Sequence, residues 1–264
     1  MKRTPVNRDP DSYPAGIAPF LMDAALYDSS CSSEARVIYI EKDGGLFLKE
    51  AAAGTLKTEA EMTGWLYTRG LSAEMLCYGT HGGRDYMVTR RLPGEDCTHS
   101  MYMADPKRLC DTTAGLLRQL HETDTANCPV QDRNRTYIDT VKRSFDGHAY
   151  EPDLFAGLVE FDSFEEAKRT AEEGFPLLMR EVLLHGDYCL PNIILKNWRL
   201  SGYIDVGTGG IGDRHIDILW GIWTLKFNLG TAEYTERFLD AYGRDKAESE
   251  KLRYLAAMEM IGGF

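Results

Sequence analysis

The sequence lacks several features that define common classes of protein. Its 264 residues include 30 Lys and Arg against 41 Asp and Glu, so the formal net charge is −11. A chain without a basic surplus has no electrostatic footprint for nucleic acid or for an anionic membrane surface. No apolar leader and no long apolar run is present, which favours a cytoplasmic protein. We expect a small-molecule partner, and the acidic charge permits a cationic one.

Cysteine and histidine do not form a metal-binding pattern. The six cysteines include no C-x-x-C pair, and the six histidines are scattered without ligand-like spacing to a cysteine. A zinc site is therefore not expected, and a reduced compartment is the default. With 43% hydrophobic residues the chain can bury a sizeable core, and its length suggests one large domain or two lobes.

The character of the sequence changes about one third of the way along the chain. Residues 1–16 are rich in proline and are expected to form an irregular lead-in. Strand-like runs then flank one helical stretch over residues 55–71. After the "RLPGED" string the pattern is mainly helical. The expected fold class is α+β, with a small β-rich lobe of residues 1–92 containing one helix, and a larger, mainly helical lobe of residues 93–264.

Polar residues interrupt an apolar hairpin in the second lobe. The string "HGDYCLPN" contains Asp187 and Asn192, and "IDVG" places Asp205 at the end of the following strand. Kinase-type sites have the same Asp-to-Asn spacing in H-R-D-x-x-x-x-N, followed by D-F-G. Each residue alone is typical of a loop cap or a turn. Together they predict side chains that converge on one nucleotide and Mg²⁺, which prefers such oxygen ligands.

The first lobe offers a complementary cation. Lys49 lies in the strand-like run "LFLKEA", and kinases pair a lysine of this lobe with a helix glutamate to hold the nucleotide phosphates. Glu59 is the expected partner, and Glu61 on another helix face is the alternative. No G-x-G-x-x-G precedes the lysine. "DSSCSSEARV" stands there, with Ser33 at the tip of a phosphate-binding turn or of an ordinary polar turn.

Longer strings resemble one family of small-molecule kinases. "HGDYCLPNIIL" and "LSGYIDVGTGGIGDRHIDI" are similar to strings of the aminoglycoside 3′-phosphotransferases, bacterial antibiotic kinases with a protein-kinase-like fold. The resemblance continues through "LFLKEA", "EAEMTGWL", "RRLPGED" and "LLRQLHETD", so it covers most of the chain from about residue 25. It implies a two-lobed protein-kinase-like fold, with Mg²⁺ as cofactor and ATP, or alternatively GTP, as phosphoryl donor.

The resemblance also implies roles for individual residues. Asp187 would be the catalytic base toward the acceptor hydroxyl, and Asn192 and Asp205 would bind Mg²⁺. The residues implied in nucleotide binding are Lys49 and Glu59 at the phosphates, Phe47 stacked on adenine, and the backbone of Arg90 and Leu92 at the adenine edge. Asp217 would stabilise the catalytic loop, with a helix cap as the alternative, and His185 would shape it.

The positions expected to bind the acceptor molecule depart from the family pattern. Thr208 stands where the family has an arginine, and Trp223 and Phe227 stand where it has an arginine and a glutamate. Ile261 and Gly262 replace an acidic pair near the C-terminal phenylalanine. The residues that could still contact a cationic acceptor are Asp153, Glu160, Glu259, the carboxylate of Phe264, and an apolar wall of Trp223 and Phe227. The alternatives are a solvated helix face for the acids and core packing for the aromatic residues.

The sequence therefore predicts an ATP-dependent phosphotransferase that acts on a hydroxyl of a small cationic acceptor, with the 3′-hydroxyl of an aminoglycoside as the first candidate. The alternatives are a kinase of another small hydroxylated metabolite or antibiotic, and a non-catalytic nucleotide-binding protein. A metal hydrolase built on the His-Gly-Asp string would want further histidines. The donor preference and the oligomeric state, monomer or dimer, stay open.

Overall fold

The chain divides into two units. A computed structural model describes residues 3–31 and 35–262. The first unit comprises Met1–Gly94 and Ser201–Gly207, and the second comprises Glu95–Leu200 and Thr208–Phe264. The division falls two residues after the predicted boundary, and it assigns a later segment to the first unit. That segment is fixed there because Tyr203 donates its backbone N–H to the Leu71 carbonyl over 2.8 Å, and Ser72 donates its hydroxyl to the Tyr203 carbonyl over 3.0 Å.

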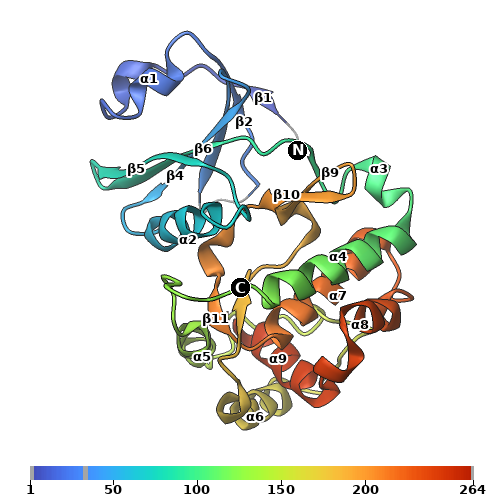
Figure 1. Cartoon of the computed structure of the whole chain (residues 1–264). Coiled ribbons are helices and arrows are strands. Elements are labelled where there is room, and N and C mark those ends of the chain that lie inside the picture. Colours follow the sequence, from blue (N-terminus) through green and yellow to red (C-terminus); the bar gives the residue numbers. More distant parts are fainter. Residues whose placement is uncertain (1–2, 32–34, 263–264) are drawn as a thin grey trace. The chain divides into compact units, whose positions relative to one another are not determined.

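The first unit is built on a six-stranded sheet with the order β1-β2-β3-β4-β6-β5, in which all neighbouring strands are antiparallel (Figure 1). Its strands are β1 (Thr4–Pro5), β2 (Ala25–Asp28), β3 (Arg36–Glu41), β4 (Leu46–Ala52), β5 (Met75–His81) and β6 (Arg84–Arg90). Its helices are α1 (Ala18–Leu21) and α2 (Lys57–Tyr67), with a 3-10 turn over Pro10–Ser12. The structure thus adds α1 to the one helix expected, and β1 and the 3-10 turn to the lead-in expected to be irregular.

Strand β4 shows how the sheet positions a charged side chain. Successive side chains of a strand point to opposite faces of the sheet. Leu46 and Leu48 are fully buried in one hydrophobic cluster. Ala51 packs in a different cluster, together with Ala60 of α2. Because Lys49 alternates with the leucines, it lies on the face that α2 covers.

The second unit is mainly helical (Figure 1). Its helices are α3 (Ser100–Met103), α4 (Pro106–His121), α5 (Arg133–Arg143), α6 (Phe164–Gly174), α7 (His215–Leu229), α8 (Thr235–Tyr242) and α9 (Ser249–Gly262). Its strands are β7 (Glu95–Asp96), β8 (Val182–Leu184), β9 (Ile193–Lys196) and β11 (Gly210–Gly212), and β10 (Arg199–Tyr203) begins in this unit and ends in the first. The strands form two sheets with the orders β10-β9-β7 and β11-β8.

Local sequence signals explain the boundaries of the helices. The Asp105 side chain accepts the N–H of Arg108 at the start of α4, where Pro106 occupies the first turn. Helix α7 ends at Gly230, which adopts the left-handed conformation with φ 70°. These caps fix where α4 begins and where α7 ends.

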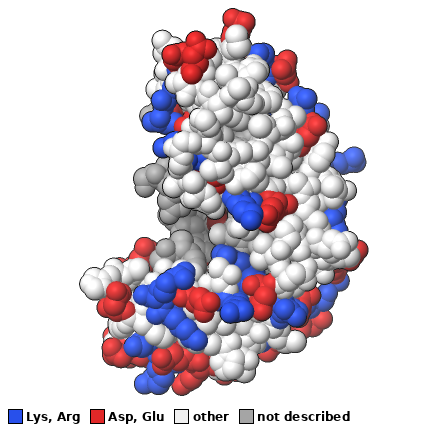
Figure 2. Space-filling model, turned by 90° about the vertical axis from the view of Figure 1, so that its left-hand side faces the viewer, with Lys and Arg blue, Asp and Glu red and all other residues white. Residues whose placement is uncertain are grey.

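Charged side chains of both signs lie on the molecular surface. Basic and acidic residues lie interspersed on the face shown in Figure 2. Within residues 3–31 and 35–262, no helix combines the length and the apolar character needed to cross a membrane.

Candidate active site

The loop after β8 carries the predicted catalytic base. Asn192 donates its Nδ2 to Asp187 twice, over 2.8 Å to the carboxylate Oδ2 and over 3.1 Å to the backbone carbonyl. A 3-10 turn over Leu190–Asn192 brings the amide back toward the aspartate. Asp187 remains partly exposed, while Asn192 is buried. The loop therefore presents a carboxylate in a fixed orientation to the outside.

Asp217 of α7 anchors the backbone just before the base. Its two carboxylate oxygens accept the N–H groups of His185 over 2.7 Å and of Gly186 over 2.8 Å. Gly186 has φ 86°, and a β-carbon added to it would meet the Thr208 carbonyl oxygen at 2.0 Å. Only glycine fits this position, which the His-Gly-Asp string supplies.

Further contacts tie the rest of the loop to two helices. The Tyr188 hydroxyl donates to the Thr113 carbonyl of α4 over 2.7 Å. The Leu190 N–H donates to Thr224 Oγ1 of α7 over 3.0 Å. His185 is buried, and its Nδ1 accepts the Asp187 N–H over 3.3 Å. Thr224 was not singled out from the sequence, where a threonine within the apolar run "DILWGIWTLKF" was the available signal.

The first unit brings together the residues predicted to bind phosphate. Lys49 Nζ lies 2.9 and 2.8 Å from the two carboxylate oxygens of Glu59, and 2.9 Å from Asp205 Oδ1. Glu61, the alternative partner, is exposed. Burial lowers the pKa of Lys49, but the Asp205 and Glu59 carboxylates outweigh burial, so the pKa is raised. Lys49 is therefore a permanent cation whose side chain is 18% exposed.

The residues expected to stack on the adenine ring or to contact its edge also lie in the first unit. The Arg90 N–H already donates to the Glu74 carbonyl over 2.9 Å, so only the Arg90 carbonyl remains as a group for adenine. Phe47 is partly buried, and its ring centroid lies 5.3 Å from that of Tyr39. Leu92 is also partly buried. The adenine contacts stay predictions, and Ser33 lies outside the described residues.

The residues predicted to hold Mg²⁺ offer oxygen donors. Since Asn192 directs its Nδ2 to Asp187, its carbonyl oxygen is left for a cation. The Asp205 side chain is 50% exposed and places only one of its oxygens against Lys49 in the ion pair. An amide oxygen and a carboxylate are the hard ligands that Mg²⁺ prefers. Each donor is of a kind that suits the ion, and the metal-binding role of both residues stays a prediction.

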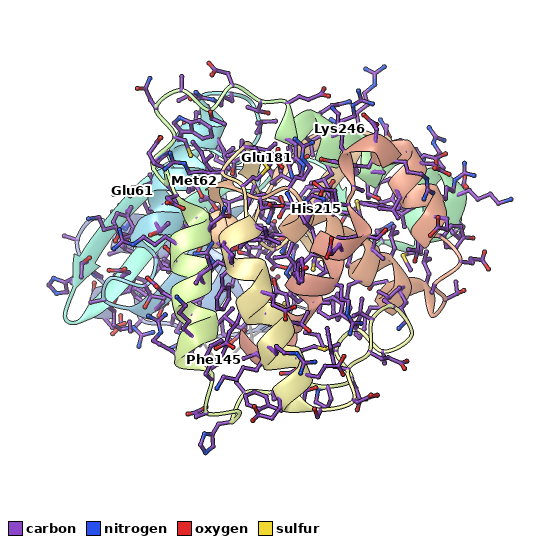
Figure 3. All side chains as sticks on the ribbon, turned by 90° about the horizontal axis from the view of Figure 1, so that it is seen from below. Glu61, Met62, Phe145, Glu181, His215 and Lys246 are labelled. Carbon is purple, nitrogen blue, oxygen red and sulfur yellow. The ribbon has the colours of Figure 1, made fainter. Side chains whose placement is uncertain are left out.

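In a second group of possible metal ligands, the side chains already form hydrogen bonds with other groups of the protein. Atoms of Glu181, Asp213 and His215 lie within 4.8 Å of one another. Figure 3 labels Glu181 and His215 of this group. His215 Nδ1 contacts Asp213 over 2.6 Å, and its Nε2 accepts the N–H of Glu248 over 2.9 Å. Arg214 donates to both carboxylate oxygens of Glu181, over 2.7 and 3.0 Å. These atoms form a saturated polar network rather than a cation site.

The predicted acceptor residues fall into three groups. Trp223 and Phe227 stack with centroids 4.9 Å apart and planes at 14°, and Phe227 is 69% exposed. Asp153 and Glu160 are exposed. Glu259 was expected to be within reach of the acceptor, but it is only 1% exposed, because α9 turns this carboxyl group into the interior. Phe264 lies outside the described residues.

Comparison with known proteins shows the family of the chain. The profile described as "Phosphotransferase enzyme family" matches residues 32–255. The chain belongs to this family. A Lactococcus lactis protein named probable aminoglycoside 3′-phosphotransferase is 40% identical over 252 residues, which are 96% of each chain. An aminoglycoside 3′-phosphotransferase of Niallia circulans is 32% identical over 78% of each chain. The expected relationship and phosphotransferase class are therefore confirmed.

Solved structures confirm the fold class. The crystal structure of an aminoglycoside 3′-phosphotransferase of type VIII matches with a TM-score of 0.72 at 24% identity, over 90% of this chain and 93% of the other. An aminoglycoside phosphotransferase of Streptomyces rimosus, in complex with ADP and streptomycin, matches with a TM-score of 0.69 at 22% identity, over 86% and 90%. This phosphotransferase thus has the α+β, protein-kinase-like fold predicted from its motifs.

Proposed function

We propose that this phosphotransferase moves the γ-phosphoryl group of ATP to the 3′-hydroxyl of an aminoglycoside. The observation that carries the proposal is the Asp187 carboxylate, partly exposed and held by Asn192 on a backbone that Asp217 anchors. A carboxylate in a fixed orientation suits a base that accepts the proton of a hydroxyl nucleophile. The choice of acceptor is supported by the Lactococcus lactis relative, whose name specifies aminoglycoside 3′-phosphorylation.

In the proposed reaction Asp187 accepts the hydroxyl proton as the acceptor oxygen bonds to the γ-phosphorus. The bond from the γ-phosphorus to the β–γ bridging oxygen breaks, and ADP leaves with that oxygen. Lys49, kept protonated by Glu59 and Asp205, orients and neutralises the phosphates. A bound Mg²⁺, held by Asn192 and Asp205, would supply further charge neutralisation.

The adenine would lie against Phe47, with its edge at the Arg90 carbonyl and the Leu92 backbone. Since the Arg90 N–H is engaged with Glu74, the hydrogen bond there would run from the adenine amino group to the Arg90 carbonyl. A guanine base carries a carbonyl oxygen where adenine carries that amino group, so this edge favours ATP over GTP. Comparing initial rates with the two nucleotides at equal concentration tests the preference.

The acceptor would be bound by charge and by an apolar surface. Asp153 and Glu160 are exposed and could pair with acceptor amines. Trp223 donates its indole N–H to the Leu154 carbonyl over 2.7 Å, which fixes the plane that Phe227 extends. This partly exposed aromatic pair favours a second candidate function, phosphorylation of a hydroxylated molecule with fewer amines. ADP release measured with neutral and cationic acceptors separates the two functions.

The test of the proposed function compares Asp187→Asn with the unchanged protein. Removing the base should lower kcat by about 10²- to 10⁴-fold while the affinity for nucleotide stays nearly intact. Asp139→Asn, an exposed change on α5, is the matched control. Resistance of a susceptible bacterium to kanamycin-like but not to 3′-deoxy compounds would support the position. An Asp187→Asn protein with full activity would refute the assignment.

A further inference from the structure

A row of aromatic side chains crosses the sheet of the first unit beside the ring expected to stack on adenine. Tyr27 of β2 lies directly opposite Tyr39 of β3, which lies directly opposite Phe47 of β4. The ring centroids of Tyr39 and Phe47 are 5.3 Å apart with planes at 55°, and those of Tyr27 and Tyr39 are 6.1 Å apart at 41°. Residues directly opposite on neighbouring strands share a face of the sheet, so the row lies on the face that also carries Lys49, two positions after Phe47.

Tyr39 is the central ring of this row, and it is contacted from several sides. The guanidinium carbon of Arg3 lies 3.5 Å from the Tyr39 ring centroid, so this cation covers one face of the ring. A β-carbon added to Gly45 would meet the Tyr39 hydroxyl oxygen at 2.8 Å and a ring carbon at 3.0 Å, so the ring packs directly against the turn before β4. As a result Tyr39 is only 6% exposed, although Arg3 itself is exposed.

The same ring connects the stacking position to the segment expected at the adenine edge. The Gly45 carbonyl accepts the N–H of Arg91 over 2.9 Å, and a β-carbon on Gly45 would lie 3.2 Å from Arg91 Cβ. Arg91 stands between the two residues proposed to contact the adenine edge. Tyr39 therefore contacts Phe47 on one strand and, through the turn, the backbone of Arg91 on another segment.

We infer that Tyr39, covered by Arg3, is a positioning residue for the nucleotide base: it holds the Phe47 ring and the Arg91 backbone in the arrangement that binds adenine. This inference rests on the proposed placement of adenine against Phe47. Phe47 is only partly buried, so its ring has an open side. Immobilising such a side chain on binding costs affinity unless the ring is already held. The contact with Tyr39 holds it before the nucleotide binds.

Packing in the hydrophobic core alone would not require a ring at this position. Ile38 and Ile40, the neighbours of Tyr39 in β3, are fully buried in the hydrophobic cluster on the opposite face of the sheet. The contacts of Tyr39 on its own face include two aromatic rings and a guanidinium group. An aliphatic side chain offers neither the ring contact nor the attraction between a cation and a π face.

The experiment separates binding of the base from binding of the phosphates. Tyr39→Leu keeps an apolar side chain without the ring, Tyr39→Phe keeps the ring without the hydroxyl, and Arg3→Ala uncovers the ring. Isothermal titration calorimetry in a buffer with Mg²⁺ measures the affinity of each protein for ADP and for inorganic tripolyphosphate. Tripolyphosphate carries no base, so it reports on the phosphate site at Lys49 independently of Phe47.

Arg69→Ala is the matched control. The Arg69 guanidinium carbon lies 3.6 Å from the Trp65 ring centroid, so this variant removes the same kind of contact from the same unit. Neither Arg69 nor Trp65 contributes to the row of rings beside Phe47. The affinity of Arg69→Ala for both probes should stay within about twofold of that of the unchanged protein.

Tyr39→Leu should weaken ADP binding about 5- to 10-fold, because an aromatic contact and the order of the Phe47 ring are lost together. Its affinity for tripolyphosphate should stay within about twofold, since Lys49 keeps its partners. The KM for ATP should rise with little change in kcat, because ribose and two phosphates separate the base from the transferred phosphoryl group. Arg3→Ala should weaken ADP binding about 2- to 5-fold, and Tyr39→Phe should retain nearly full affinity.

Equal weakening of ADP and tripolyphosphate binding in Tyr39→Leu would overturn the inference, since the whole unit would then be disturbed. Unchanged ADP binding in that variant would overturn it as well. If Tyr39→Leu does not fold, Arg3→Ala decides in the same comparison, because an exposed side chain can be truncated without opening the core.

Failure of the proposed function would give a different result. Unchanged ADP binding in Phe47→Leu would refute the placement of adenine on which the inference depends. An unchanged protein that binds ADP but transfers no phosphate to any aminoglycoside would refute the proposed acceptor, while the two binding measurements would still decide the role of Tyr39.

Discussion

The buried carboxyl group of Glu259 should make stability fall as pH rises through the neutral range. It is 1% exposed and accepts the indole N–H of Trp220 over 3.0 Å. Burial raises its pKa from the ordinary 4.5 to about 8, although hydrogen bonds from Tyr137 and Trp220 act in the opposite direction. The folded protein thus keeps a proton on Glu259 over a pH range in which the unfolded chain has released it.

The sign and size of the effect follow from proton linkage. Between pH 4.5 and about 8 the folded state binds more protons at this site than the unfolded state, so the free energy of unfolding decreases with pH. The stabilisation that protonated Glu259 provides is complete below pH 4.5 and is lost once the pH has passed about 8. At about 1.4 kcal/mol per pKa unit, the total is on the order of 5 kcal/mol.

Glu259→Gln keeps the shape and the acceptor for Trp220 but cannot ionise. Urea unfolding, followed by tryptophan fluorescence from pH 5 to pH 9, gives the free energy of unfolding of both proteins. Between pH 5 and pH 9 the free energy of unfolding of the variant should rise relative to that of the unchanged protein by about 4 kcal/mol. Glu172→Gln, an exposed change on α6, is the control and should leave the slope unaltered. Parallel curves for Glu259→Gln and the unchanged protein would refute the reasoning.

Three further outcomes are expected. Glu59→Gln should raise the KM for ATP about 10- to 100-fold, because Lys49 loses a charged partner, whereas Glu61→Gln should not change it in the same assay. Gly186→Ala should destabilise the protein by about 1–3 kcal/mol in urea titrations, since φ 86° is strained for alanine and its β-carbon has no room. Burial raises the pKa of Asp213, but hydrogen bonds led by His215 lower it to about 2, so its stabilisation should be present above pH 3.8 and lost as pH falls through 2. The free energy of unfolding of Asp213→Asn, measured at acidic pH, should not show this loss.

Contacts between residues close in sequence were predictable. Asp187 and Asn192 are five positions apart in one loop, and their hydrogen bond follows from a single 3-10 turn. Lys49 and Glu59 are ten positions apart, and strand alternation with helix burial brings them together. The pairing of Lys49 with Glu59 was expected from the kinase pattern, whereas the hydrogen bond between Asn192 and Asp187 was not, although both residues were expected in one site.

Contacts across long separations were not predictable in the same way. The Ser72 hydroxyl binds a carbonyl 131 positions later, and this contact assigns residues 201–207 to the first unit. No local pattern at Ser72 or Tyr203 specifies such a partner. Glu259 was expected to lie within reach of the acceptor, yet its carboxyl group is buried and accepts the indole N–H of Trp220, 39 positions earlier.

The polarity of single core positions is the signal that sequence reasoning can still use for such contacts. His121, Thr224 and Glu259 each interrupt the apolar face of a helix, and each is buried. A polar group in the interior needs a partner, so each interruption implies a contact whose other member lies elsewhere in the chain. The partners are Asp217, the Leu190 N–H and Trp220. Two of these three contacts act on the loop that carries Asp187, so polar residues on the apolar faces of α4 and α7 help to hold the catalytic loop.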